Sequence, residues 1–326
     1  MSEFANTLRP HFVNGVVTLF ARPDSLTVAD LIVSRRSAYS LDFDPTRSKV
    51  LLDFREPELI SIATASDCNR LFTAAFQSAS SVPGGLTDRF TIPWALIRLY
   101  YSAFYSAHAV LRLLGNSACH FESRHVTKIV TVANAIGRPL PFPFTGGMYQ
   151  CSVESSGTVL GLVKVGAGQN GGSHESFWAF YESQIRALGD AILLGPLPAT
   201  VKQPVVAKLE GLRRLMDVNA AFGKLSRVRN DVQYRHTHDI WFPTGLSASE
   251  RQALSRSAAR WNADPMSIDM DATGDSTLMQ FVRACVFQVA VANDVAAMLS
   301  QRAPKGHKSF VEFQPNAYLN LIRQPA

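Results

Sequence analysis

The segment Arg229–His236 begins and ends with side chains suited to chemistry, an arginine and a histidine seven positions apart in a predicted helix. Each residue turns an α-helix by about 100°, so seven residues bring a side chain back to within roughly 20° of its starting direction. Val218, Phe222 and Leu225 are predicted on the same arc. Arg229 and His236 therefore extend what is otherwise a buried, apolar stripe.

A permanently charged guanidinium and an imidazole that titrates near neutral pH are both costly in a buried position. We expect them where that end of the stripe faces a cleft or a second subunit. The guanidinium offers a planar fork of donors that matches phosphate oxygens, and an imidazole can accept or donate a proton. Asn230 can orient the imidazole or hold a phosphate, although it lies about 100° away from Arg229 around the helix.

The spacing alone is weak evidence, because short arginine–histidine patterns arise by chance in a chain with eight histidines. Arg302 and His307 form such a pattern, but a proline and a glycine between them prevent a helix from aligning the pair. The predicted helical context separates Arg229 and His236 from this second match.

Hydrophobic periodicity predicts the elements that must position the pair. The longest helical pattern covers about residues 205–234, and further helices are expected at 58–77, 92–114, 122–136, 174–194 and 279–299. Strands are expected at 16–20 and 49–54, and in a hairpin of 149–153 and 158–165. Loops are expected at 78–85, at the Pro/Gly-rich stretch 138–147, and at the Gly-rich stretch 166–172.

This order of elements predicts a mainly α protein with two parts. Residues 1–57 form a β-rich N-terminal segment, and residues 58–326 form a helical bundle. A β-hairpin is inserted into the bundle at about residues 139–172. The bundle therefore has to supply the helix that carries Arg229 and His236.

Charge and cysteine usage restrict the function classes. The net charge of +6 and the isoelectric point near 9.2 give a mild preference for anionic partners. The four cysteines are widely scattered and form no C-x-x-C pair, which argues against a zinc site or a disulfide framework. They are Cys68, Cys119, Cys151 and Cys285.

One segment, residues 92–114, is apolar enough to suggest a membrane span. Arg98, His108 and Arg112 interrupt it, so we expect a buried core helix of a soluble protein instead. The N-terminal residues lack the basic-then-apolar pattern of a signal peptide, which predicts a cytoplasmic location. Arg98 and Arg112 share a polar stripe of this helix and are expected to contact RNA or a buried carboxylate.

The helix at 92–114 carries a Tyr-Tyr-x-x-Phe core, Tyr100-Tyr101-Ser-Ala-Phe104, and lies upstream of the segment Arg229-Asn230 to His236. In this order the two segments resemble the HEPN superfamily, in which an aromatic core helix of this type precedes a helix with an arginine, a polar residue and a downstream histidine. The resemblance implies an all-α bundle that dimerises. The β segment and the hairpin depart from the minimal bundle of the family.

Many members of the family are metal-independent endoribonucleases. The resemblance therefore implies that Arg229 and His236 are catalytic, that Asn230 holds the polar position, and that no cofactor or metal is needed. The substrate would be RNA, cleaved by its own 2′-hydroxyl, with a second copy of the chain completing a basic cleft. It also implies a toxin of bacterial anti-phage defence or of a toxin–antitoxin system, restrained by an antitoxin or sensor protein.

Two other functions stay open. In one of them the chain is a catalytically silent HEPN-like module that binds nucleic acid or a protein. Alternatively, it is a regulatory subunit whose β segment senses a ligand and controls the helical part. The run His236-Thr-His238-Asp239 offers possible metal ligands, but its spacing at a helix end favours a solvated turn.

Overall fold

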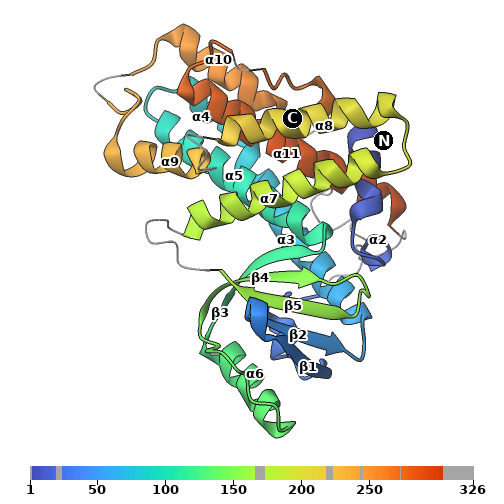
Figure 1. Cartoon of the computed structure of the whole chain (residues 1–326). Coiled ribbons are helices and arrows are strands. Elements are labelled where there is room, and N and C mark those ends of the chain that lie inside the picture. Colours follow the sequence, from blue (N-terminus) through green and yellow to red (C-terminus); the bar gives the residue numbers. More distant parts are fainter. Residues whose placement is uncertain are drawn as a thin grey trace.

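The computed structural model describes residues 2–19, 24–165, 173–217, 223–242, 245–271 and 273–303. Within them the protein is mainly helical, with one small antiparallel sheet. Figure 1 shows the long helices gathered in one body, with the sheet and helix α6 (Ser123–Ala135) at one end. The prediction of a mainly α protein is confirmed at this level.

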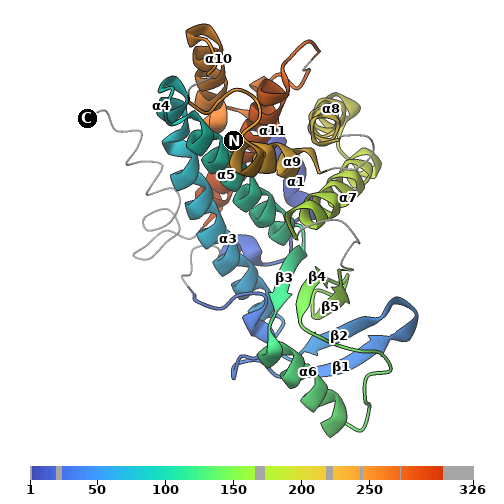
Figure 2. The ribbon, with the colours of Figure 1, turned by 90° about the vertical axis from the view of Figure 1, so that its left-hand side faces the viewer.

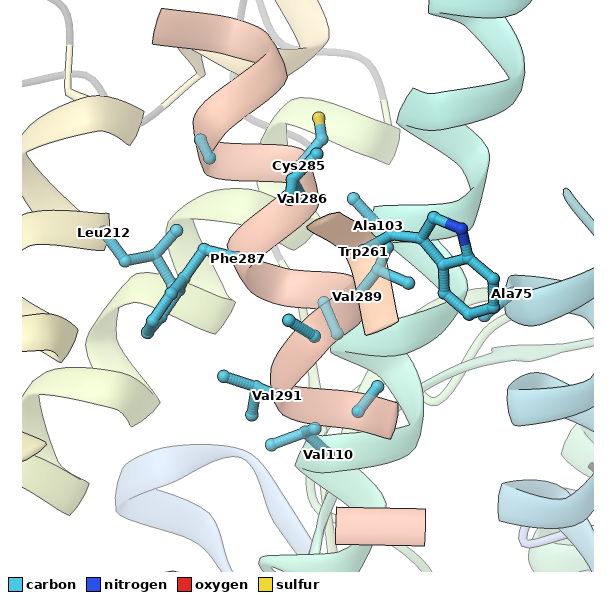
Figure 3. Close-up of a cluster of buried hydrophobic side chains, with 14 of the residues drawn as sticks. Ala75, Ala103, Val110, Leu212, Trp261, Cys285, Val286, Phe287, Val289 and Val291 are labelled. Atoms are coloured by element: carbon cyan, nitrogen blue, oxygen red, sulfur yellow. The ribbon is translucent and has the colours of Figure 1, made fainter. Parts of the chain in front are cut away.

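Five long helices build the body, and the sequence pattern predicted α3, α5, α7 and α11 close to their observed bounds. They are α3 (Glu58–Ser80), α5 (Ile92–Leu113), α7 (Ser173–Leu194), α8 (Ala199–Met216) and α11 (Thr277–Arg302). Helix α11 lies in the middle, and its apolar side chains are buried on several sides. In Figure 3, Phe287 of α11 points toward Leu212 of α8, while Trp261 and Ala103 lie on the other side of α11. A helix that is apolar all round is expected at the centre of such a body.

Among the described helices, α11 alone is long and apolar enough to cross a membrane. Its most apolar stretch is 83% buried inside the protein, which is typical of the core helix of a soluble protein. Residues 92–114, which the sequence pattern singled out as span-like, do not meet this description, but the expectation that they form a buried core helix is confirmed. Helix α5 contains three tyrosines, a tryptophan and a proline, whereas α11 contains five valines, and this difference gives α11 the higher mean hydropathy.

Shorter helices cover the ends of the body. They are α1 (Glu3–Leu8), α2 (Val16–Leu19), α4 (Val82–Thr87), α9 (Lys224–Asn230) and α10 (Ala248–Ala258), with a π-helix at Asp231–Arg235 and 3₁₀ turns at 9–11, 30–32, 45–47, 259–262 and 265–267.

Two of these short helices correct the sequence prediction. The strand expected at 16–20 is helix α2 over its described residues, because Val16 and Leu19, three positions apart, both reach the core. The loop expected at 78–85 is instead the end of α3 followed by α4. Pro83 lies in the first turn of α4, where a missing backbone N–H costs little.

Five strands form one antiparallel sheet in the order β1-β2-β5-β4-β3. They are β1 (Tyr39–Asp44), β2 (Lys49–Phe54), β3 (Asn116–Phe121), β4 (Gly147–Val153) and β5 (Val159–Lys164). The predicted strand at 49–54 and the predicted hairpin are confirmed. Because β2 pairs with β5, strands from the N-terminal segment and from the hairpin belong to the same sheet.

Strand β3 was not predicted. Its sequence, Asn-Ser-Ala-Cys-His-Phe, has no β-branched residue and gives little strand signal. The chain leaves α5 through Gly115, whose positive φ of 78° suits a glycine, and then pairs along the whole of β4. Tertiary pairing therefore decides the conformation of this segment.

The protein has two hydrophobic cores, one among the long helices and one around the sheet and α6, and helix α3 contributes side chains to both. Figure 2 shows α3 running beside α5 from the helical body to the sheet. The buried carboxylate of Asp67 accepts hydrogen bonds from Arg112 Nε of α5 at 2.9 Å and from the Val28 N–H at 3.2 Å. It also pairs with the more exposed Arg70. Of the two partners expected for Arg112, RNA or a buried carboxylate, the structure shows the buried carboxylate.

Candidate active site around Arg229

Arg229 lies on a short helix that follows a break in the predicted long helix. The single helix expected over about 205–234 is wrong, because α8 ends at Met216 and α9 begins at Lys224. Val218 and Phe222, predicted on the stripe with Arg229, lie outside the described residues. Leu225 is fully buried in the core, as the stripe requires.

The guanidinium of Arg229 is buried against two tyrosines of α5. Arg229 is 7% exposed, and its Cζ lies over the rings of Tyr100 and Tyr101 at 5.2 Å and 5.9 Å from their centroids. Its Nη1 donates to Gln233 Oε1 at 3.3 Å. Cation–π contacts of this kind stabilise a desolvated guanidinium in part.

Arg229 nevertheless lacks the partner that a buried charge normally has. Within the described ranges it forms no ion pair with a carboxylate, and its buried Nε–H has no hydrogen-bond partner. Arg112 and Arg213, the other well-buried arginines, both pair with carboxylates. A buried, uncompensated guanidinium is costly, so this position favours an anionic ligand.

His236 lies at the end of the π-helix and not on a buried stripe. The wider turn of a π-helix advances each residue by less than the 100° of an α-helix, so Arg229 and His236 do not share one helical face as predicted. His236 is exposed, has a left-handed conformation (φ 53°), and stacks on Trp241 with ring centroids 4.8 Å apart. The expectation that both side chains lie on the apolar arc is therefore wrong for His236.

The turn after the π-helix is unusual in its backbone. Of the four non-glycine residues with positive φ in the described chain, three are His236, His238 and Asp239. Such conformations cost free energy and tend to cluster at functional sites, as do π-helical turns. Trp241 fixes the turn, because its Nε1 donates to the Val232 carbonyl at 2.8 Å.

Asn230 is the last residue of α9 and is half-buried. Its side-chain amide makes no hydrogen bond within the described part of the chain. Among these residues it therefore does not orient His236. Tyr234 is 68% exposed, in agreement with a direction away from the core.

A second imidazole, His174 at the start of α7, lies beside Arg229. The Tyr100 hydroxyl is 2.9 Å from His174 Nδ1 and accepts a hydrogen bond from Trp178 Nε1 at 3.1 Å. The hydroxyl oxygen can accept two hydrogen bonds, so the tautomer of His174 sets which of the two groups donates in this contact. Arg229 and His174 both contact Tyr100 and Tyr101.

The charge of Arg229 also acts on these neighbours. Burial, with the nearby Arg229 charge, lowers the pKa of His174 to about 4. Burial raises the pKa of Tyr100 to about 12, although the Trp178 hydrogen bond and Arg229 oppose that rise. At neutral pH both groups are therefore neutral, and Arg229 is the charged member of the cluster.

His174 and Gln233 were not predicted as site residues from the sequence. Tyr100 and Tyr101 were recognised only as part of an aromatic core helix. A histidine at the start of a helix, 55 residues before Arg229, carries no local signal that it will meet that arginine. Only the packing of α5, α7 and α9, which lie together in Figure 1, brings these side chains into contact.

Comparison with protein-family models, curated proteins and solved structures gave no match to this chain. Functional assignment therefore rests on the site residues themselves.

A pH dependence of stability follows from His174. Between about pH 6.5 and pH 4 the unfolded chain binds a proton at this side chain that the folded protein does not, so stability falls as the pH falls. His174 is only half-buried, and solvent screening reduces the effect. We expect the melting temperature of a His174→Gln variant, followed by circular dichroism, to fall less on acidification than that of the unaltered protein. His120→Gln, at an exposed strand position, is the control; equal acid sensitivity in all three proteins would contradict the assignment.

Proposed function

We propose that the chain is a metal-independent endoribonuclease of HEPN type, with Arg229 and His236 as its catalytic residues. The observation that carries the proposal is the buried guanidinium of Arg229, which has no carboxylate partner among the described residues and faces the aromatic core helix. An RNA phosphate is the ligand that its fork of donors fits. His236, exposed a few residues further on, supplies an imidazole for proton transfer.

The chemistry follows from these two groups. RNA carries its own nucleophile, the 2′-hydroxyl, which attacks the adjacent phosphorus after His236 removes its proton. The new O2′–P bond forms as the P–O5′ bond breaks, and Arg229 stabilises the charge on the non-bridging oxygens. The 5′-oxygen leaves with a proton from an acid. The products are a 2′,3′-cyclic phosphate and a 5′-hydroxyl, and the route needs no metal ion.

One imidazole does not easily act on both sides of the phosphate. The proposal therefore includes a homodimer, in which a two-fold axis brings a second Arg229–His236 pair to the same basic cleft. It also includes a cytoplasmic toxin of bacterial defence or of a toxin–antitoxin system, restrained by an antitoxin or sensor. A strictly monomeric protein that cleaves RNA at full rate would count against the dimer, and sedimentation velocity measures this.

Cleavage of RNA in EDTA tests the proposal. We expect the purified protein to cut a mixed-sequence RNA with the chelator present, and to leave the same sequence with 2′-O-methyl groups intact, because that RNA has lost its nucleophile. Cleavage only after a divalent cation is added, or cleavage of both RNAs, would exclude the mechanism. Binding without cleavage would favour the alternative of a catalytically silent module.

One observation supports the alternative of a ligand-sensing subunit. A hollow of about 280 Å³ lies where the N-terminal segment meets the end of α5 and the β4–β5 turn. His11, Asn14 and Glu154 are among its polar lining residues. A small polar molecule bound there would contact both the sheet and the helical body.

A further inference from the structure

The described chain exposes aromatic side chains in one region only. Four aromatic residues are largely solvent-exposed, and their exposed fractions are 63% for Phe90, 54% for Trp94, 68% for Tyr234 and 66% for Phe242. Phe90 lies two residues before α5, Trp94 lies in the first turn of α5, and the other two lie in the segment between Arg229 and residue 242. The other exposed large apolar residues, Val130, Ile136, Leu193 and Leu194, are aliphatic and lie on α6, at its end, or on α7.

Three of these rings, together with that of Trp241, form two contacting pairs, and the second pair reaches His236 of the candidate active site. Phe90 and Phe242 have centroids 6.0 Å apart, Trp94 and Trp241 are also 6.0 Å apart, and His236 stacks on Trp241. We call the set Phe90, Trp94, Trp241 and Phe242 the aromatic surface. Because Tyr101 follows Trp94 by seven residues, the same side of α5 continues from this surface to the tyrosine that contacts Arg229.

Arginines accompany the rings. Arg89 lies over both phenylalanines, with its Cζ 5.1 Å from the Phe90 centroid and 5.5 Å from that of Phe242. Arg98 is exposed one turn after Trp94. Residues 88–101 and 227–242 together contain five arginines and three aspartates. One of those aspartates, Asp231, already pairs with Arg235.

We propose that the aromatic surface binds unpaired bases of single-stranded RNA by stacking and directs the strand to Arg229 and His236. Flat exposed rings alternating with arginines are the features with which proteins hold single strands, because every base has a face to stack and every nucleotide a phosphate. Base-paired RNA hides those faces, so a duplex gains only the phosphate contacts. The inference rests on the proposed function for its ligand, and its test does not depend on cleavage.

Tryptophan fluorescence can be used to follow binding of a ligand to the aromatic surface. Trp178 and Trp261 are buried, whereas Trp94 is exposed and Trp241 half-buried, so quenching of tryptophan emission reports on the aromatic surface. The probe is a single-stranded 2′-O-methyl oligoribonucleotide, which the proposed mechanism cannot cut. We expect it to quench the emission and to bind the full chain more tightly than its duplex does.

Two exposed-ring variants, Phe90→Ala and Trp94→Ala, test the contacts. Each is expected to weaken single-strand binding, measured by fluorescence anisotropy, about tenfold to a hundredfold. Leu194→Ala removes a side chain that is more exposed, at 89%, but lies on α7, and it is expected to change nothing.

Three results would overturn the inference. Equal affinity for single strand and duplex, or full affinity in both ring variants, would show that the rings do not stack on bases. Loss of a dimer in Trp94→Ala, with unchanged binding of the probe, would assign the surface to a second copy of the chain. Stacking-dependent binding in a protein that never cuts RNA would support the inference while removing the proposed nuclease.

Discussion

Replacing His236 with asparagine is expected to lower kcat for RNA cleavage by about 10²–10⁴-fold, the usual contribution of a general acid or base. Asparagine suits the test because it adopts the left-handed backbone of this position readily, whereas alanine would add strain. The fold should therefore survive while the imidazole is lost. Initial rates on a fluorescent RNA, with circular dichroism of both proteins, measure this.

His238→Asn is the matched control. His238 has the same left-handed conformation (φ 73°) two residues further on, and no role in the chemistry is assigned to it. It is expected to cleave at close to the full rate. Loss of activity in His238→Asn with activity kept in His236→Asn would reverse the assignment.

Arg229→Lys tests the second half of the same site. Lysine keeps the charge but loses the planar fork and its contact with the two tyrosine rings, so we expect a loss of about 10²–10³-fold in kcat. Arg227→Lys, an exposed change on the same helix, should have little effect. Full activity in Arg229→Lys would show that only a positive charge is needed.

Replacing Asp67 with alanine is expected to lower the free energy of unfolding by about 3–5 kcal/mol. Asp67 and Arg112 are both buried, and the Asp67 charge keeps the pKa of Arg112 above its usual value although burial opposes this. Without the carboxylate, a buried guanidinium is left uncompensated, and the Val28 N–H loses its acceptor. Urea unfolding followed by fluorescence gives the change.

Arg70→Ala provides the comparison for this ion pair. Arg70 also bonds Asp67 but is half-exposed, so its removal should cost less than about 1 kcal/mol. A double variant, Asp67→Leu with Arg112→Met, should recover much of the loss because no charge remains buried. Similar destabilisation by Arg70→Ala and Asp67→Ala would contradict the idea that burial sets the effect.

The sequence predicted those elements whose signal is local. Helices α5, α7 and α11 have long periodic patterns with clear ends, and the β4–β5 hairpin has a turn between two apolar runs. Strand β3 has no such signal and exists because it can pair with β4. Helix α2 was mistaken for a strand because four residues are too few to separate the two periods.

The sequence likewise predicted only part of the candidate site. The pattern predicted a buried position for Arg229, and the structure agrees. It could not predict the π-helix, which moves His236 out of register with Arg229, because a local change of helix type leaves no mark on hydrophobic spacing. The place of His174 in the site could not be predicted from the sequence, because its contact with Tyr100 joins residues 74 positions apart.

The end groups of the cleaved RNA test the central claim most directly. RNA cut in EDTA by the unaltered protein should carry 2′,3′-cyclic phosphates and 5′-hydroxyls, read by mass spectrometry, and His236→Asn should release almost none of these ends. Fragments with 3′-hydroxyls and 5′-phosphates, or cyclic ends produced at the full rate by His236→Asn, would contradict an Arg229–His236 ribonuclease.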